Sequence, residues 1–272
     1  MIPPRVGTQE PKESPSRPFS RSTGATPLNR DLCQVCWLGR IDYLHARTLE
    51  ELLARARAED RVTDTLLLVE HPPIYTLGRR SDDKHILVPR QVLERQGVAV
   101  CRTDRGGGVT FHGPGQLVGY PVVSLKDRQG GLGRYLRDLE KILIQVLSQF
   151  AIPAGRLQGF TGVWVEDRKI AAIGVKLNAG RITGHGFALN VTTDLSYFSQ
   201  IVPCGIHHKG VTSMSRILGR EVPLAPVRKA LTKAFSQVFK KHAEEVAPEK
   251  LFAFDKGTRQ TADATRACGV TS

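Results

Sequence analysis

Three consecutive glycines near the middle of the chain constrain its fold more than any other stretch of the sequence. They belong to the segment Arg105–Gln116 (RGGGVTFHGPGQ), and residues 117–123 that follow are mostly apolar and β-branched or aromatic. Glycine adopts backbone angles that are closed to other residues and lets the backbone approach a ligand closely. The pattern therefore predicts a ligand-contacting loop that leads into a buried strand.

This loop does not follow the common phosphate-binding patterns. A P-loop ends in Gly-Lys-Ser or Gly-Lys-Thr, and the dinucleotide fingerprint needs a third glycine where a helix begins. Neither feature occurs in the segment. The sequence therefore does not favour a nucleotide-binding role for the glycine-rich loop.

The segment does resemble the signature of the lipoyl(octanoyl) transferases, the octanoyl-acyl-carrier-protein:protein N-octanoyltransferases. The matching positions are Arg105, Gly106, Gly107, Thr110, Phe111, His112, Gly115, Gln116 and Tyr120. The similarity runs from Val35 to about Val238 and includes residues 169–174 (KIAAIG), 185–190 (HGFALN) and 201–205 (IVPCG). The resemblance implies the biotin/lipoate protein ligase-like fold, of the class II aminoacyl-tRNA synthetase and biotin synthetase type.

Local patterns independently predict an α+β fold, a mixed and mainly antiparallel sheet with flanking helices. Strands that pair locally, with helices that interrupt rather than alternate strictly, favour this class over a doubly wound sheet. Strands are expected at residues 32–39, 65–70, 74–78, 98–102, 117–123, 162–166, 169–177 and 182–191. The last three are expected to be antiparallel, with turns at Asp167-Arg168 and at residues 178–181.

Three amphipathic helices are expected. Asp42 is predicted to cap the first one. The second has apolar residues spaced along 136–150 and is expected to end at Pro153 and Gly155, and the third follows Pro226.

One catalytic domain with two extensions is expected. Residues 1–30 hold six prolines and are predicted to be a disordered N-terminal extension; residues 31–243 form the octanoyltransferase catalytic domain, and 244–272 a peripheral C-terminal tail. No apolar run approaches the length of a membrane span, so no membrane association is expected. Five cysteines at irregular spacing, without a secretory signal, predict a reducing compartment and a cytoplasmic protein.

The formal net charge of +13 predicts an acidic partner. Its basic residues are dispersed and not interleaved with aromatic residues, so nucleic acid is not the expected partner. The resemblance implies octanoyl-acyl carrier protein as donor. It also implies lipoyl domains of 2-oxoacid dehydrogenase E2 subunits and the glycine cleavage H protein as acceptors.

Cys204 is the candidate nucleophile, because Pro203 fixes the backbone before it and Gly205 leaves space beside its sulfur. A lone cysteine is more often a small buried apolar residue, so the residues alone leave both interpretations open. The resemblance implies that Cys204 carries the acyl group as a thioester and that Lys169 is its catalytic partner, since a nearby positive charge favours the thiolate. Lys176 competes for this role but is expected to be a solvated strand residue.

The resemblance also implies a set of substrate-binding residues. They are Arg105, Gly106, Gly107, Gly108, Val109, Thr110, Phe111, His112, Ala172, Ile173, Gly174, Gly186, Phe187 and Ala188. Tyr75 is part of the acyl pocket, of the core packing, or of both. His112 and His185 are either bases or hydrogen-bonding struts.

No metal or cofactor is expected. The pair Cys33 and Cys36 has redox-motif spacing, but no second Cys or His pair is present to complete a zinc site. The predicted function is transfer of an octanoyl or lipoyl group from acyl carrier protein to a lipoyl-domain lysine, the first step of protein lipoylation. The alternatives are an ATP-dependent lipoate or biotin ligase, and an amidotransferase that moves octanoyl between two lipoyl domains.

Overall fold

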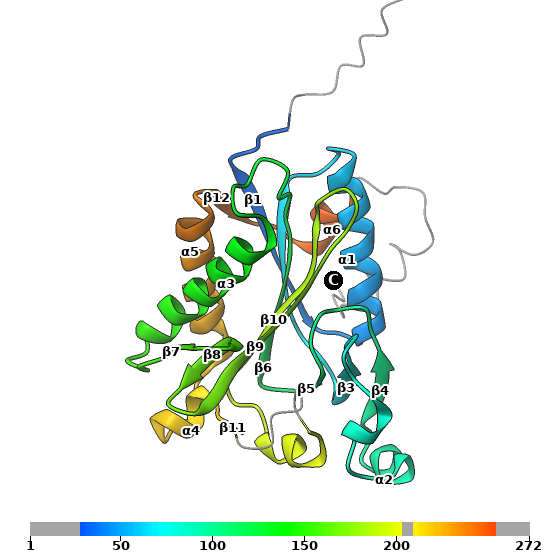
Figure 1. The fold of residues 1–272 in the computed structure, drawn as a ribbon. Coiled ribbons are helices and arrows are strands. Elements are labelled where there is room, and N and C mark those ends of the chain that lie inside the picture. Colours follow the sequence, from blue (N-terminus) through cyan, green and yellow to red (C-terminus); the bar gives the residue numbers. More distant parts are fainter. Residues whose placement is uncertain (1–27, 203–208, 254–272) are drawn as a thin grey trace, which may run out of the picture.

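A large mixed sheet forms the centre of the computed structural model, which describes residues 28–202 and 209–253 (Figure 1). Its strand order is β12-β1-β2-β6-β10-β9-β8-β7, and β11 pairs with β9 outside this path. A smaller sheet has the order β4-β3-β5. The strands are β1 (Leu32–Arg40), β2 (Asp64–Glu70), β3 (Ile74–Leu77), β4 (Ala99–Arg102), β5 (Val109–His112), β6 (Gln116–Val122), β7 (Gly155–Leu157), β8 (Phe160–Val165), β9 (Arg168–Leu177), β10 (Thr183–Asn190), β11 (Gly210–Val211) and β12 (His242–Glu245).

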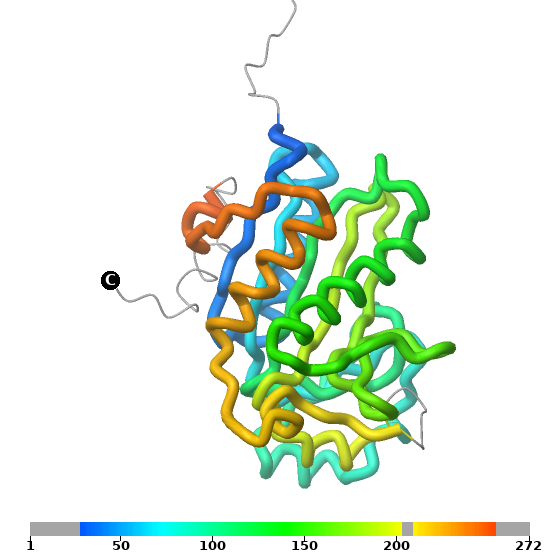
Figure 2. Tube along the Cα trace, turned by 90° about the vertical axis from the view of Figure 1, so that its left-hand side faces the viewer, coloured from blue at the N-terminus to red at the C-terminus, as the bar shows by residue number. Residues whose placement is uncertain are grey.

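Helices cover both faces of the large sheet. The α-helices are α1 (Tyr43–Ala58), α2 (Arg90–Arg95), α3 (Gly131–Ser148), α4 (Met214–Leu218), α5 (Leu224–Phe239) and α6 (Pro248–Leu251), and the 3-10 turns are η1 (Asp83–His85) and η2 (Leu195–Gln200). Helices α3 and α5 lie together on one face, whereas α1 and α6 lie on the other (Figures 1 and 2). This arrangement confirms the predicted α+β class.

Strand β2 shows why the sheet needs cover on both faces. Leu66 and Leu68 pack into the core under α3 and α5, whereas Leu67 and Val69 pack into the core under α1. Because side chains alternate between the faces of a strand, an apolar run such as this one is stable only between two layers.

The predicted antiparallel arrangement of β8, β9 and β10 is confirmed. The predicted cap of α1 is confirmed as well, since the Asp42 carboxylate accepts hydrogen bonds from Leu44 N at 2.8 Å and His45 N at 3.1 Å. These bonds satisfy two of the amide groups that a helix start leaves without partners.

Two predicted helix boundaries are wrong by a few residues. Helix α3 ends at Ser148, well before Pro153, because Ala151 adopts a left-handed conformation and Ile152 N bonds back to Leu147 O. Helix α5 begins at Leu224, two residues before Pro226. Proline is tolerated there, since the first turn of a helix needs no amide donor.

The turn between β8 and β9 is also one residue earlier than predicted. Glu166 has a φ of 53°, and Arg168 already belongs to β9. The turn is therefore formed by Glu166 and Asp167.

The C-terminal part of the described chain packs against the sheet. The expected boundary at residue 243 falls inside β12, which pairs in parallel with β1. Beyond it, Leu251 and Phe252 are buried in the core under α1. Residues 244–253 thus pack with the central sheet and its helices, and residues 1–27 and 254–272 lie outside the described part. Among the described helices, none has the length and apolarity that crossing a bilayer requires.

A test of the packing concerns Gly119, which lies in the middle of β6. A Cβ atom at this position would lie 2.2 Å from the ring of the buried Phe187. Gly119→Ala should therefore lower the free energy of unfolding by about 1–3 kcal/mol, the usual cost of overpacking. Urea denaturation measures this change.

Gly133→Ala in α3 is the matched control. A Cβ there meets no other group within 4 Å, and alanine favours helix over glycine, so this variant should be as stable as the parent or slightly more so. Equal effects of the two substitutions would contradict the packing argument.

Candidate active site

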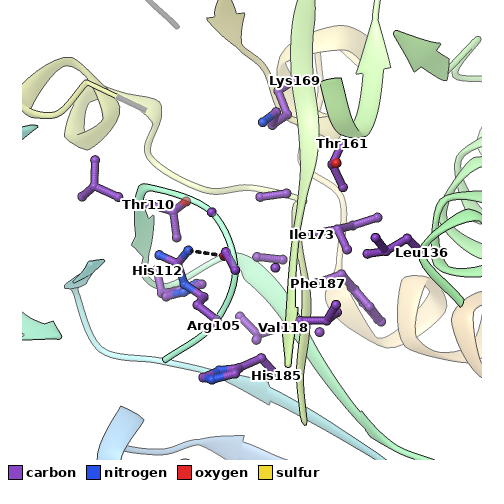
Figure 3. A pocket seen from close by; sticks show the side chains of 18 of the residues that line it. Arg105, Thr110, His112, Val118, Leu136, Thr161, Lys169, Ile173, His185 and Phe187 are labelled. Atoms are coloured by element: carbon purple, nitrogen blue, oxygen red, sulfur yellow. Dashed lines mark hydrogen bonds between the residues drawn. The ribbon is translucent and has the colours of Figure 1, made fainter. Parts of the chain in front are cut away.

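A cavity of about 530 Å³ lies where the glycine-rich loop meets β9 and β10 (Figure 3). Five neighbouring segments line most of it: the start of α1, the glycine-rich loop together with β5, and the strands β6, β9 and β10. The cavity is therefore built by residues distant in sequence that the central sheet brings together.

Backbone hydrogen bonds hold the glycine-rich loop on both sides. On one side, Gly106 N donates to Val175 O in β9 at 3.1 Å. On the other, Arg79 N donates to Arg105 O and Arg80 N to Gly107 O, each at 3.1 Å. The fit also requires glycine at position 78, where a Cβ would lie 2.5 Å from Gly107 O. The loop is thus clamped between β9 and residues 78–80.

Lys169 lies at one end of the cavity, and a β-bulge decides which way it points. Val163 pairs with Ala171 and Trp164 with Lys169, so Ile170 is an extra residue in β9. Ile170 and Ala171 both pack into the core under α3. Because the bulge shifts the alternation of faces by one residue, Lys169 lies on the opposite face, the face of Ala172 and Gly174. Its Nζ is 4.8 Å from the Trp164 ring centroid, within the range of a cation–π contact.

Arg105 is buried and lies across the cavity next to β9. Its Nη2 donates to Thr76 O at 2.6 Å and to Thr76 Oγ1 at 2.9 Å, and its Nη1 donates to Gly106 O at 3.2 Å. The absence of a Cβ at Gly174 makes room for this side chain, because that atom would lie 3.3 Å from Arg105 Cδ.

His112 contacts the same Thr76 hydroxyl as Arg105. Its Nδ1 donates to Gln116 Oε1 at 2.8 Å, and its Nε2 lies 3.3 Å from Thr76 Oγ1. Gln116 in turn donates to Asn190 Oδ1 at 2.8 Å. Burial lowers the pKa of His112 to about 3, so the ring is neutral at neutral pH. With both ring nitrogens in contact with partners, His112 has the geometry of a strut.

His185 belongs to a network of charged groups behind the loop. It has a φ of 55°, its backbone N–H donates to buried Glu50, and its Nε2 is 2.8 Å from Asp104 Oδ1. Burial, followed by the nearby charge of Arg47, lowers the pKa of His185 to about 3. Partial burial would raise the pKa of Asp104, but hydrogen bonds from Lys176 and His185 hold it well below its usual range.

Lys176 is therefore more constrained than expected. Its side chain is 40% exposed, as a solvated strand residue would be, but its ammonium forms an ion pair with Asp104. It does not line the cavity, whereas Lys169 does.

The cavity brings most of the predicted site residues together. Those that line it are Arg105, Gly106, Gly107, Val109, Thr110, His112, Lys169, Ala172, Ile173, Gly174, His185, Gly186, Phe187 and Ala188. Cys204 lies outside the described residues.

Three predicted residues support the cavity from outside its lining. Gly108 O accepts a hydrogen bond from Gly78 N. Phe111 stacks on Tyr197 with ring centroids 4.5 Å apart, and Tyr75 donates its hydroxyl hydrogen to Tyr197 O at 2.7 Å. This contact fits core packing of Tyr75, and its part in the acyl pocket stays a prediction.

Several lining residues were not predicted. Tyr43 follows the cap of α1, Leu132 and Leu136 begin α3, and Phe160 and Thr161 begin β8. The sequence carries no signal for their role, since each belongs to an ordinary apolar or polar pattern. Only the packing of α1, α3 and β8 around β9 brings them to the cavity.

The remaining cysteine and metal expectations concern other parts of the fold. Cys33 packs into the core under α3, and Cys36 into the core under α1, so the two thiols lie on opposite faces of the sheet. Burial strongly raises the pKa of the Cys33 thiol. Within residues 28–202 and 209–253, no three Cys, His, Asp or Glu side chains form a group that could hold a metal ion.

Comparisons with known proteins agree with the geometry. The lipoyl protein ligase A/B catalytic domain matches residues 42–236. The chain is 50% identical over 207 residues to the octanoyltransferase of Solibacter usitatus, across 76% of this chain and 93% of the relative. It is also 50% identical over 201 residues to the octanoyltransferase of Rubrobacter xylanophilus, across 74% of this chain and 90% of the relative.

Solved structures resemble the fold at low sequence identity. Lipoate-protein ligase A bound with ATP has a TM-score of 0.67 at 19% identity, covering 86% of this chain and 92% of that chain. A bipartite lipoate protein ligase from Thermoplasma acidophilum has a TM-score of 0.62 at 18% identity, covering 86% and 90%. These matches confirm the predicted lipoate protein ligase-like fold.

The buried histidines predict that the fold loses stability in mild acid. Burial lowers the pKa of His71 to about 4, and both of its ring nitrogens have partners, Ile41 O and the Tyr120 hydroxyl. In the unfolded chain His71 binds a proton at its ordinary pKa near 6.5, whereas in the folded protein it binds one only near pH 4. Stability should therefore fall as the pH drops from 6.5 towards 4.

His71→Gln should remove one of the protons that the protein takes up when it unfolds in mild acid. In urea denaturation between pH 7.5 and 4.5, the variant should be less stable at pH 7.5 but should lose less stability in acid. Its slope below pH 6 should be shallower by up to about 1.4 kcal/mol per pH unit. Parallel curves for the variant and the parent would show that His71 takes up its proton at the same pH in the folded and unfolded states, and would contradict the prediction.

Proposed function

Since the chain belongs to the lipoyl protein ligase A/B catalytic-domain family and is an acyltransferase of the octanoyltransferase type, we propose that it transfers octanoyl from acyl carrier protein to a lipoyl-domain lysine through a thioester on Cys204. The observation that carries this proposal is the position of Lys169. It lines the cavity, and β11, which begins six residues after Cys204 in the sequence, pairs with β9 at Arg168 and Lys169.

In the first half-reaction, the Cys204 thiolate attacks the carbonyl carbon of the carrier-bound thioester. The carrier leaves as its thiol, having taken a proton from the Lys169 ammonium, so that Lys169 becomes neutral. One thioester is exchanged for another, so the step needs no ATP. A neighbouring lysine ammonium favours the thiolate, because unlike charges about 4 Å apart attract by roughly 4 kcal/mol at an effective dielectric constant near 20. Lys169 is the proposed source of this charge.

In the second half-reaction, the amine of the acceptor lysine attacks the enzyme thioester, and the Cys204 thiolate leaves as the amide forms. The amine must lose a proton, and Lys169 in its neutral form is the proposed acceptor. Backbone amides of the glycine-rich loop and of β9 are the proposed donors to the carbonyl oxygen as negative charge develops on it. The acceptors we propose are the lipoyl domains of 2-oxoacid dehydrogenases and the glycine cleavage H protein.

The charge near the cavity suits acidic carrier and acceptor proteins. Arg79 and Arg80 line the cavity and are exposed, so they extend positive charge to solvent at its margin. The whole chain carries a net charge of +13. Such a surface speeds the encounter with negatively charged proteins.

The direct test is a search for the thioester. Parent protein mixed with octanoyl-acyl carrier protein should gain the mass of one octanoyl group, which hydroxylamine removes, and Cys204→Ala should neither gain this mass nor acylate a lipoyl domain. Cys101→Ser is the matched control, because Cys101 is half-exposed on β4 and does not line the cavity. A folded Cys204→Ala protein with substantial transfer activity would rule out the proposed mechanism.

A second prediction separates the two lysines of β9. Lys169→Ala should slow alkylation of Cys204 at pH 7 about tenfold or more and move its pH midpoint upward, since the thiolate loses a positive neighbour. Lys176→Ala should leave both near normal, because the Lys176 ammonium pairs with Asp104. Peptide mapping after iodoacetamide treatment at a series of pH values isolates Cys204 from the other cysteines. The reverse ranking would assign the role to Lys176.

A further inference from the structure

Arg105 divides the cavity into an apolar part and a polar part. On the side of Lys169, the β9-β10-β6 surface presents one row of small apolar side chains, Ala172, Ala188 and Val118, which are cross-strand neighbours. The next row contains Gly174 and Gly186, and Arg105 lies over Gly174. Figure 3 shows Lys169 at one end of the view and His185 at the other, with Arg105 between them.

Hydrogen bonds to the protein hold the Arg105 guanidinium as a fixed wall of the cavity. Its donors to Thr76 O, Thr76 Oγ1 and Gly106 O point at the protein. The side chain is 7% exposed, and the Gly106 to Val175 hydrogen bond ties its backbone to β9. Moving it would break several hydrogen bonds of a buried charge, which is costly.

The distance from Lys169 to this wall suits a medium-length acyl chain. Five residue steps along β9, shortened by the bulge, span roughly 13–17 Å. An extended octanoyl chain has seven carbon–carbon bonds and measures roughly 9 Å, if each ~1.5 Å bond advances the zigzag by about 1.25 Å. The thioester and the Lys169 side chain take up part of the remaining length. By the same measure, a chain of sixteen carbons needs roughly 19 Å and would run into Arg105.

We propose that Arg105, laid across Gly174 and anchored by Thr76, is the end stop that sets the length of the acyl chain. This inference rests on the proposed function. Each methylene up to the stop is buried over Ala172, Ala188 and Val118, which should raise kcat/KM by roughly three- to fourfold per carbon. Further methylenes meet the guanidinium and gain nothing, so the enzyme prefers about eight carbons.

The test measures kcat/KM for acyl transfer to a lipoyl domain from small thioesters with 4, 6, 8, 10 and 12 carbons. Arg105→Met keeps an unbranched stem but removes the guanidinium, and should move the optimum to 10 or 12 carbons, with at least a tenfold gain in the ratio of dodecanoyl to octanoyl transfer. Thr76→Val removes one anchor of Arg105 without altering the cavity lining, and should broaden the optimum towards 10 carbons. Ala172→Val adds two methyl groups to the apolar part of the cavity and so reduces its volume, which should shift the optimum to 6 carbons or fewer.

Arg102→Met is the matched control, because Arg102 is exposed on β4 and pairs with Asp83 away from the cavity. Its chain-length profile should be that of the parent. If Arg105→Met does not fold, the opposite shifts of Thr76→Val and Ala172→Val support the stop. If the parent transfers octanoyl and the folded variants keep its chain-length optimum, only the end stop is overturned. If the parent transfers no acyl chain of any length, the proposed function is overturned and the end stop with it.

Discussion

The hydrogen bond from Gly106 N to Val175 O is the contact on which the cavity depends, because it joins the glycine-rich loop to the central sheet. The same hydrogen bond holds Arg105, the residue before Gly106, next to Gly174. The loop can approach β9 this closely only because several positions lack a Cβ. At Gly174 that atom would lie 2.9 Å from Gly106 O. The glycines thus serve close backbone packing as much as ligand access.

A network of charged groups, some buried and some exposed, supports the same loop from behind. Asp104, one residue before Arg105, accepts hydrogen bonds from His185 in β10 and Lys176 in β9, and it lies 3.7 Å from Arg47 in α1. Glu50 of α1 accepts the backbone N–H of His185, whose left-handed conformation is costly for a non-glycine residue. Three elements therefore converge on the loop, and the network stabilises the strained residue that joins them.

The fold class followed from the sequence because its cause is local. The apolar run of β2, the apolar spacing of α3 and the cap at Asp42 are each properties of short segments. Helix ends were less predictable: α3 stops through the left-handed conformation of Ala151, which no residue pattern announces. The motif residues of the site were predictable for a different reason, since a glycine-rich segment with a defined order of polar residues resembles few families.

The sequence by itself determined the longer strands and helices, the motif residues and the two candidate lysines. Only the tertiary structure decided how these residues are used. A regular strand would have turned Lys169 into the core under α3, and the extra residue Ile170 turns it towards the cavity instead. Tyr43, Leu136 and Phe160 reach the cavity by packing against β9 and its neighbours, and Arg105 becomes a wall through its bonds to Thr76. A β-bulge and a contact between distant segments depend on how strands pair, and strand pairing is not encoded in any single stretch of the chain.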